Sequence, residues 1–268
     1  MPVPRLVLTI AGSDPTGGAG IQGDSRALGA LGVHALSAIT CITTQGVRGV
    51  LRVVPLEPAL VRAQIDAVLE GVDVGAIKIG ALGSAGIVRV VAAAVARVAV
   101  PIVLDPVLAS TRGAALLDRR GLAALVRVLM PRVTLVTPNT AELGVLLDRP
   151  APRDVAALRE ATRALHAMLG IAVLGKGGHL DDAPIDVLID ADGERLYRGA
   201  RVEGPAVHGT GCTLSSAIAA HLARGRSLRA AIGLAKPFVA AAIRAAIPLG
   251  TGARPLDPYA AARRPRSR

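Results

Sequence analysis

Aromatic residues are almost absent from this sequence. Among 268 residues there are one Phe, two Tyr and no Trp, although 51% of the residues are hydrophobic. The core must therefore be built from Ala, Val, Leu and Ile, which suits parallel strands covered by helices better than an aromatic-rich β-sandwich. The shortage also argues against nucleic-acid binding, because unpaired bases commonly stack on aromatic side chains.

Cysteine and long apolar runs are scarce as well. Cys41 and Cys212 form no CxxC pair, so we expect reduced thiols rather than a disulfide or zinc framework. No apolar run reaches the length of a membrane span. The N-terminal MPVPRLVLTIAG has too short an apolar run, interrupted by prolines, for a signal peptide. These absences predict a soluble, cytoplasmic protein with no membrane partner.

Acidic residues are outnumbered by basic ones, since 31 Lys and Arg against 20 Asp and Glu give a formal charge of +11. A surplus of this size can indicate a nucleic-acid partner. Here the arginines are scattered along the predicted helices, and the one dense run is RRPRSR at residues 263–268. We interpret the surplus as solvated surface plus attraction for anionic small molecules, and we predict no nucleic-acid partner.

Short apolar runs alternate with longer segments of helical pattern along the chain. The runs predict strands at Leu6–Ile10, Val33–Thr43, Ala76–Gly80, Pro101–Leu104, Thr134–Val136 and Ala172–Leu174, and a hairpin of Ile185–Ile189 with Arg195–Tyr197. The periodic segments predict helices up to Leu31 and at Pro58–Leu69, Ser84–Val98, Gly121–Met130, Asp154–Leu169, Thr213–Ala223 and Ser227–Ile247. This alternation predicts one α/β domain with a mostly parallel central sheet and helices on both faces.

Four polar segments follow predicted strands: GSDPTGGAGIQGD at 12–24, TQG at 44–46, TPNTAE at 137–142 and GKGGH at 175–179. Because the carboxyl ends of parallel strands meet at one edge, these segments should form one ligand site. Gln45 offers a donor and an acceptor that suit a flat heterocycle. Asp14 and Asp24 are the polar groups of the first loop, and a turn or capping role for Asp14 is equally open. Asn139 and Glu142 also fit a helix cap.

A glycine turn runs directly into a helix-forming segment in VHGTGCTLSSAIAA at residues 207–220. The N–H groups at such a helix start lack intrahelical partners and, with the helix dipole, favour an anion. The same field would lower the pKa of Cys212 and make the thiol a usable base or nucleophile. The alternative is an ordinary capped turn with a small buried cysteine.

The motifs together resemble a known family. GSDPTGGAGIQGD, TQGV, KIGALGS, LDPV, TPNTAE, GKGGH and HGTGCTLSSAIAAHLARG occur in order between Leu6 and Ile247. They resemble the hydroxymethylpyrimidine/phosphomethylpyrimidine kinases of thiamine biosynthesis, which belong to the ribokinase superfamily. The resemblance implies a single-domain, ribokinase-like three-layer sandwich for residues 1–250 and a homodimer. We expect the basic, Pro-containing tail at residues 251–268 to be poorly ordered.

The resemblance also implies an activity and its residues. The enzyme would use ATP and Mg²⁺ to phosphorylate the hydroxymethyl group of the pyrimidine and then the monophosphate. The implied catalytic groups are the base Cys212 and an anion hole of backbone N–H groups from Gly209, Thr210, Gly211 and Cys212. The implied nucleotide-phosphate contacts are Lys176 and Thr210, and the implied ligands of hydrated Mg²⁺ are Glu142, Asn139 and Asp105. The implied substrate contacts are Asp24 and Gln45, with Gly12 and Val107 lining the pocket.

One position departs from the family pattern. The family usually has Met after KIG, packed against the pyrimidine, whereas this chain has Ala81. The space left by the smaller side chain can weaken pyrimidine binding or admit a bulkier ring. A pyridoxal kinase of the same subgroup is therefore the nearest alternative, because both substrates carry a hydroxymethyl group on a flat nitrogen heterocycle. A non-catalytic ligand-binding regulator on this scaffold is a third possibility.

Overall fold

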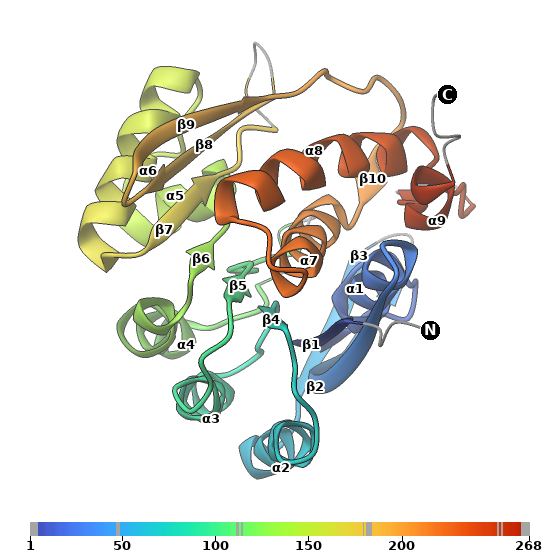
Figure 1. The fold of residues 1–268 in the computed structure, drawn as a ribbon, viewed down its shortest axis with the longest axis vertical. Helices are drawn as coiled ribbons and strands as arrows, with labels where there is room; N and C mark the ends of the chain where they lie inside the picture. The colour runs from blue at the N-terminus through green and yellow to red at the C-terminus, as the bar shows by residue number, and fades with distance from the viewer. Residues whose placement is uncertain are drawn as a thin grey trace.

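A mostly parallel sheet forms the centre of the molecule in the computed structural model, which describes residues 5–46, 49–110, 113, 115–178, 180, 184–250, 252 and 254–263 (Figure 1). Within these residues the sheet has nine strands in the order β3-β2-β1-β4-β5-β6-β7-β8-β9. The neighbours from β2 to β7 pair in parallel, and β3, β8 and β9 add antiparallel partners at the two edges. The strands are β1 (Arg5–Ser13), β2 (Val33–Gly46), β3 (Gly49–Pro55), β4 (Ala76–Ile79), β5 (Ile102–Leu104), β6 (Leu135–Val136), β7 (Ala172–Gly175), β8 (Ile185–Asp190) and β9 (Gly193–Arg198).

Helices cover both faces of this sheet (Figure 1). On one face lie α2 (Pro58–Leu69), α3 (Ala85–Val95), α4 (Arg119–Ala124), α5 (Thr140–Leu147) and α6 (Val155–Leu169). α4 continues as a π-helical turn, η1 (Leu125–Leu129), and a 3-10 turn, η2 (Met130–Arg132). On the other face lie α1 (Gly20–Ala30), α7 (Thr210–Ala223), α8 (Leu228–Arg244) and α9 (Pro258–Ala262). The predicted three-layer α/β architecture is confirmed.

Alternation along the central strands explains why two separate cores form. In β1, Leu8 and Ile10 point into the core beneath α2 to α6, whereas Val7 points into the core beneath α1, α7 and α8. β4 alternates in the same way, with Ile77 and Ile79 on the first side and Ala76 on the second. The side chain next in this alternation after Ala76 is a lysine, Lys78, and it is fully buried.

The differences from the sequence prediction that bear on the site and the edges of the fold lie at three segments. β2 runs to Gly46 and pairs with β3, a strand we did not predict because its edge position gives it no buried face and hence no hydrophobic pattern. α7 begins at Thr210, three residues earlier than predicted. Part of the segment after Gly250, which we expected to be poorly ordered, instead forms β11 (Arg254–Pro255), paired with β10 (Val207–His208), and then α9.

Three further sequence predictions relate to the described part of the chain. Both cysteines are free, as predicted. None of the described helices combines the length and the apolar character needed to cross a membrane. His179 of the GKGGH motif and residues 264–268 of the basic tail lie outside the described residues.

Candidate active site

A cavity of about 1410 Å³ lies at the carboxyl ends of the parallel strands, where the polar loops were expected to gather. We call it the strand-end cavity. Of the site residues predicted from the sequence, all but Asp24 line this cavity. The lining residues are Gly12, Gln45, Ala81, Asp105, Val107, Asn139, Glu142, Lys176, Gly209, Thr210, Gly211 and Cys212. Residues far apart in the sequence therefore share one site.

The N-terminus of α7 opens into this cavity. Gly209 is the N-cap residue, and no described side chain caps the helix. Thr213 N–H donates to Gly209 O at 2.9 Å, which is the first bond of the helix. The N–H groups of Thr210, Gly211 and Cys212 therefore precede the intrahelical ladder and are available to an anion at the positive end of the helix dipole.

Gly209 is required at the start of α7 for two reasons. Its φ is +91°, and a Cβ built on it would lie 1.8 Å from the carbonyl oxygen of Gly18. We expect Gly209→Ala to displace the helix start, lower the unfolding free energy by more than about 1–2 kcal/mol and abolish most turnover. Thermal denaturation and kcat measure the two effects.

Gly225 provides the matched control for this substitution. It has a φ of +76° just beyond the C-terminus of α7, and nothing lies within 4 Å of a Cβ built there. Gly225→Ala should therefore lower the unfolding free energy by only about 1–2 kcal/mol, from the unfavourable backbone conformation alone, and should retain kcat. Equal loss of kcat in the two variants would contradict a special role for the start of α7.

Cys212 lies where the N-termini of α7 and α1 meet. The residue is half-buried, and the Gly20 N–H donates to its sulfur. Burial raises the pKa of Cys212 to about 11, because the nearby charge of Lys78 only partly offsets burial, and Asp24 and Asp105 raise the pKa further. The predicted lowering of this pKa is therefore wrong, and the free protein holds a protonated thiol at neutral pH.

Lys176 supplies a positive charge beside the open end of α7. Its Nζ lies 2.8 Å from Asp105 Oδ1, and Thr137 Oγ1 donates to the same oxygen at 3.2 Å. A Cβ built on Gly211 would lie 3.0 Å from both Lys176 Nζ and Asp105 Oδ2, so the ion pair borders the helix start. Burial favours the neutral amine, but Asp105 and Glu142 outweigh it and raise the pKa of Lys176. Lys176 is therefore cationic.

Asn139 and Glu142 form a capping box at the start of α5. Glu142 N–H donates to Asn139 Oδ1 at 2.9 Å, and Asn139 N–H donates to Glu142 Oε2 at 2.8 Å. The capping role left open by the sequence is thus present. Burial raises the pKa of Glu142, Lys176 opposes this, and the charge of Asp105 adds to the rise. Among the described residues, no group of three or more His, Cys, Asp or Glu side chains could hold a metal ion.

Asp24 does not reach the cavity, contrary to the expectation of direct substrate contact. Its carboxylate is completely buried and accepts hydrogen bonds from Thr9 Oγ1 at 2.5 Å, Lys78 Nζ at 2.8 Å and Ser216 Oγ at 2.9 Å. These bonds join α1, β1, β4 and α7 beneath the cavity floor. Asp24 therefore has a structural position, and its charge acts on Cys212 rather than on a ligand.

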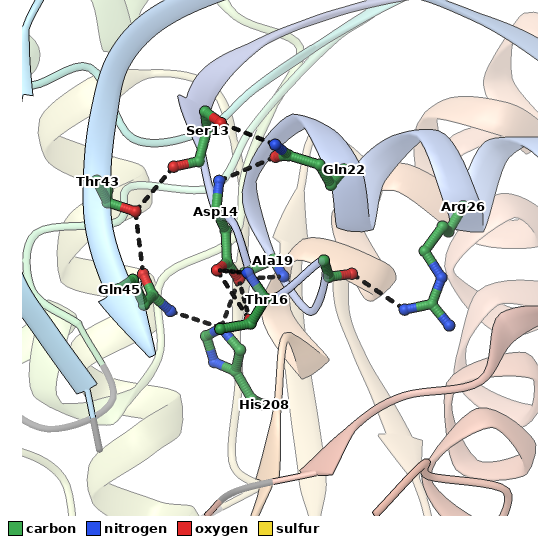
Figure 2. A network of polar contacts seen from close by, with 10 residues as sticks. Ser13, Asp14, Thr16, Ala19, Gln22, Arg26, Thr43, Gln45 and His208 are labelled. Carbon is green, nitrogen blue, oxygen red and sulfur yellow. Dashed lines mark hydrogen bonds and ion pairs between the residues drawn. The ribbon is translucent and has the colours of Figure 1, made fainter. Parts of the chain in front are cut away.

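Gln45 lies at the cavity wall in a polar network that sequence reasoning missed (Figure 2). Its Nε2 is 2.9 Å from Nε2 of His208, which is in turn 2.9 Å from Asp14 Oδ2. Asp14 also accepts bonds from the backbone N–H groups of Thr16 and Ala19, so it has the turn role as well. The sequence holds a signal for each of two residues that the sequence analysis did not single out. His208 begins the HGTGC motif, which could have indicated its place in this network, and Lys78 is a charged residue within an apolar strand, which could have indicated its buried ion pair with Asp24.

The fold and the site define a phosphotransferase, because an uncapped helix end, a lysine and two carboxylates face a cavity at the strand ends. The sequence profile of the family described as "Phosphomethylpyrimidine kinase" matches residues 14–257. A hydroxymethylpyrimidine/phosphomethylpyrimidine kinase of Streptomyces coelicolor is 43% identical over 258 residues, covering 95% of this chain and 94% of that protein. The chain therefore belongs to the phosphomethylpyrimidine kinase family.

Solved structures of two kinases share the fold of this chain. A phosphomethylpyrimidine kinase from Clostridium difficile 630 has a TM-score of 0.78 and 33% identity, covering 89% of this chain and 99% of that chain. A pyridoxal kinase of Bacillus subtilis, in an ADP complex, has a TM-score of 0.88 and 31% identity, covering 96% and 98%. The fold is thus shared by kinases of two related heterocycles, and the ribokinase-like architecture is confirmed.

Proposed function

We propose that this chain transfers the γ-phosphoryl group of ATP to the hydroxymethyl group of hydroxymethylpyrimidine, and then a second phosphoryl group to the monophosphate, for thiamine biosynthesis. The observation that carries the proposal is the uncapped start of α7, which borders Lys176 and Cys212 in the strand-end cavity. The similarity to the Streptomyces coelicolor kinase supports the choice of acceptor.

The acceptor ring would lie against Gly12, Gln45, Ala81 and Val107, with its hydroxymethyl group toward Cys212. In the transfer, the alcohol oxygen forms a bond to the γ-phosphorus, the bond to the ADP oxygen breaks, and the alcohol proton passes to the Cys212 sulfur. Only the thiolate can accept that proton. A pKa of about 11 leaves roughly one thiolate per ten thousand free molecules at pH 7.

The transferred phosphoryl group would be held by the open N–H groups of α7 and by Lys176. Both are in place before the nucleotide binds, so little reorganisation is needed as negative charge develops. The first contacts would come from Thr210, Gly211 and Cys212 N–H, and the ammonium would exchange part of its contact with Asp105 for phosphate oxygens. The cavity continues along α8, where Val239, Ala240 and Ile243 offer an apolar wall for the base.

The donor set fits a hydrated magnesium ion. Asp105 and Glu142 are buried carboxylates whose charges disfavour one another, and a divalent cation would relieve this. Magnesium is bound through few carboxylates together with water and phosphate oxygens, and it would neutralise charge on the nucleotide phosphates. Asp105 and Glu142 would hold it. The Oδ1 atom of Asn139 already accepts a hydrogen bond from Glu142 N–H. Asn139 would therefore act on the magnesium site indirectly, by holding Glu142 in place through the capping box.

Side-by-side turnover of hydroxymethylpyrimidine and pyridoxal tests the proposal. With ATP and Mg²⁺, ADP release and phosphorus NMR of the products report the rate and the number of phosphoryl groups added. We expect a higher kcat/KM for the pyrimidine and both a monophosphate and a diphosphate. A higher value for pyridoxal would favour the alternative that the Bacillus subtilis neighbour supports, and no product from either would favour a non-catalytic protein.

Ala81 gives a further prediction about the acceptor pocket. Its carbonyl is fixed by a 2.6 Å bond from Thr40 Oγ1, and the residue lines the cavity beside Gly12. Ala81→Met should fill space against the ring and lower KM for hydroxymethylpyrimidine by roughly three- to tenfold with little change in kcat. KM for pyridoxal, measured in parallel, should not fall. A raised KM for the pyrimidine would mean that the ring already occupies that space.

A cytoplasmic location, expected from the scarcity of cysteines and apolar runs, and a homodimer, implied by the family resemblance, complete the proposal. The two free cysteines are consistent with a reducing compartment, where ATP is also supplied. Light scattering at several protein concentrations would test the dimer.

A further inference from the structure

Three segments meet in the network around His208 (Figure 2). Asp14 comes from the loop after β1, Gln45 from the end of β2, and His208 from β10, immediately before the start of α7. One nitrogen, His208 Nε2, lies 2.9 Å both from Asp14 Oδ2 and from the atom placed as Gln45 Nε2. A ring nitrogen has one position for either a proton or a lone pair, so it cannot accept from one neighbour while donating to the other.

Asp14 decides which state the nitrogen has. Its carboxylate is almost completely buried and accepts the backbone N–H groups of Thr16, at 2.9 Å, and Ala19, at 2.8 Å. Burial acts to raise its pKa, but the bonds from His208, Thr16 and Ala19 outweigh it and lower the pKa. An ionised carboxylate only accepts hydrogen bonds, so Nε2 of His208 must carry the proton.

A protonated Nε2 is incompatible with an amide nitrogen beside it. Two N–H groups would then face each other at 2.9 Å. Rotating the Gln45 amide by 180° places its oxygen there instead, where it shares the Nε2 proton of His208 with Asp14 Oδ2 in a three-centre hydrogen bond. The oxygen and nitrogen of a glutamine amide are assigned from their hydrogen-bond partners, so the partners decide.

Thr43 gives the same answer on the other side of the amide. Its hydroxyl donates to Ser13 O at 2.8 Å, which uses its single proton. Its proton is directed to Ser13, so at the longer distance of 3.4 Å the hydroxyl is better suited to accept from the Gln45 amide than to donate to it. With the amide rotated, Gln45 N–H donates to Thr43 Oγ1, and both conflicts disappear together.

We propose that His208 is a positioning residue that holds the Gln45 amide with its oxygen toward His208 and its nitrogen toward Thr43, and that this order selects the acceptor heterocycle. The ring of His208 is itself held closely, since a Cβ built on Gly18 would lie 2.6 Å from its Cδ2. The amide orientation follows from the contacts of His208 and Thr43 and does not depend on what the protein phosphorylates. The selectivity rests on the proposed function.

The orientation decides how a ring can lie in the cavity. One N–H and one lone pair of the Gln45 amide remain free after the bonds to His208 and Thr43. They match a ring nitrogen that accepts and an adjacent amino group that donates. The amino group would then lie on the His208 side, and because His208 immediately precedes Gly209, the N-cap of α7, a hydroxymethyl group on the next carbon would lie on the side of α7. The reversed amide would turn that group away.

The tautomer of His208 tests the orientation without any activity. Two-bond ¹H–¹⁵N correlation spectra of histidine-labelled protein at pH 8 should show His208 protonated at Nε2, with the signal assigned by its loss in His208→Gln. His166 serves as an internal reference, because its Nδ1 lies 2.7 Å from Ile171 O and must be the protonated nitrogen. An unprotonated Nε2 on His208 would overturn the proposal, whatever the protein phosphorylates.

Substrate discrimination tests the selectivity. We expect the wild type to prefer hydroxymethylpyrimidine over its analogue lacking the amino group by at least about a hundredfold in kcat/KM. His208→Leu should reduce that ratio to less than about tenfold, mainly through KM. A purely structural loss would slow both compounds equally and leave the ratio unchanged, which would contradict the proposal. His34→Gln, an exposed change at the far end of β2, is the control and should keep the ratio.

Discussion

Cys212→Ala is expected to lower kcat/KM for the pyrimidine by about 10²–10⁴-fold, the range for removal of a general base. The Kd for ATP should change by less than about twofold, because the N–H groups of α7 belong to the backbone and Lys176 remains. Isothermal titration and steady-state kinetics separate the two effects. Turnover close to that of the wild type would show that another group accepts the proton.

The pH dependence identifies the thiol more specifically. Because the base must be deprotonated and its pKa is raised to about 11, log kcat/KM of the wild type should rise by about one per pH unit between pH 7 and 9. Cys212→Ala should lose this slope. Ser215→Ala is the matched control, since it removes a hydroxyl that bonds Gly211 O one turn along the same helix and should preserve rate and slope. A slope that persists in Cys212→Ala would assign it to another group.

Lys78→Met is expected to produce the largest loss of stability. Lys78 and Asp24 have completely buried side chains 2.8 Å apart, and removing the lysine leaves an unpaired carboxylate in the core. Breaking such a pair costs about 3–5 kcal/mol of unfolding free energy. At this chain length that corresponds to a decrease in Tm of roughly 6–10 °C. Denaturant unfolding and thermal denaturation measure the change.

Two further variants show whether the loss of stability in Lys78→Met comes from the buried ion pair. The double variant Lys78→Met with Asp24→Asn should recover much of the loss, because no net charge then remains buried. Arg149→Met removes one partner of an exposed pair, 3.7 Å from Glu160, and should change the unfolding free energy by less than about 1 kcal/mol. A Lys78→Met variant as stable as Arg149→Met would contradict an energetically coupled buried pair.

The sheet could be predicted because its signal is local. Strands such as β1 and β4 are short apolar runs, and their polar loops follow directly, so the position of the cavity could also be predicted. β3 could not, since it buries no face and obtains its hydrogen bonds from β2. β11 and α9 were missed because a short segment rich in Pro and Arg resembles a disordered tail, although Leu256 packs in the interior.

The electrostatics of the site could be predicted only in part. The open start of α7 is encoded by adjacent residues, but the pKa of Cys212 depends on burial and on charges from Lys78, Asp24 and Asp105, which distant strands and helices bring together. The contact of Gln45 with His208 joins positions 163 residues apart. No pattern within either segment contains that information, because the fold alone creates the contact.

A structure of the protein with ADP, hydroxymethylpyrimidine and a metal-fluoride mimic of the transferred phosphoryl group would test the central claim most directly. We expect the fluoride ligands to accept hydrogen bonds from the N–H groups of Gly211 and Cys212, with Lys176 in contact and the hydroxymethyl oxygen between the mimic and the Cys212 sulfur. A mimic bound elsewhere in the cavity, out of hydrogen-bond reach of the start of α7, would contradict it.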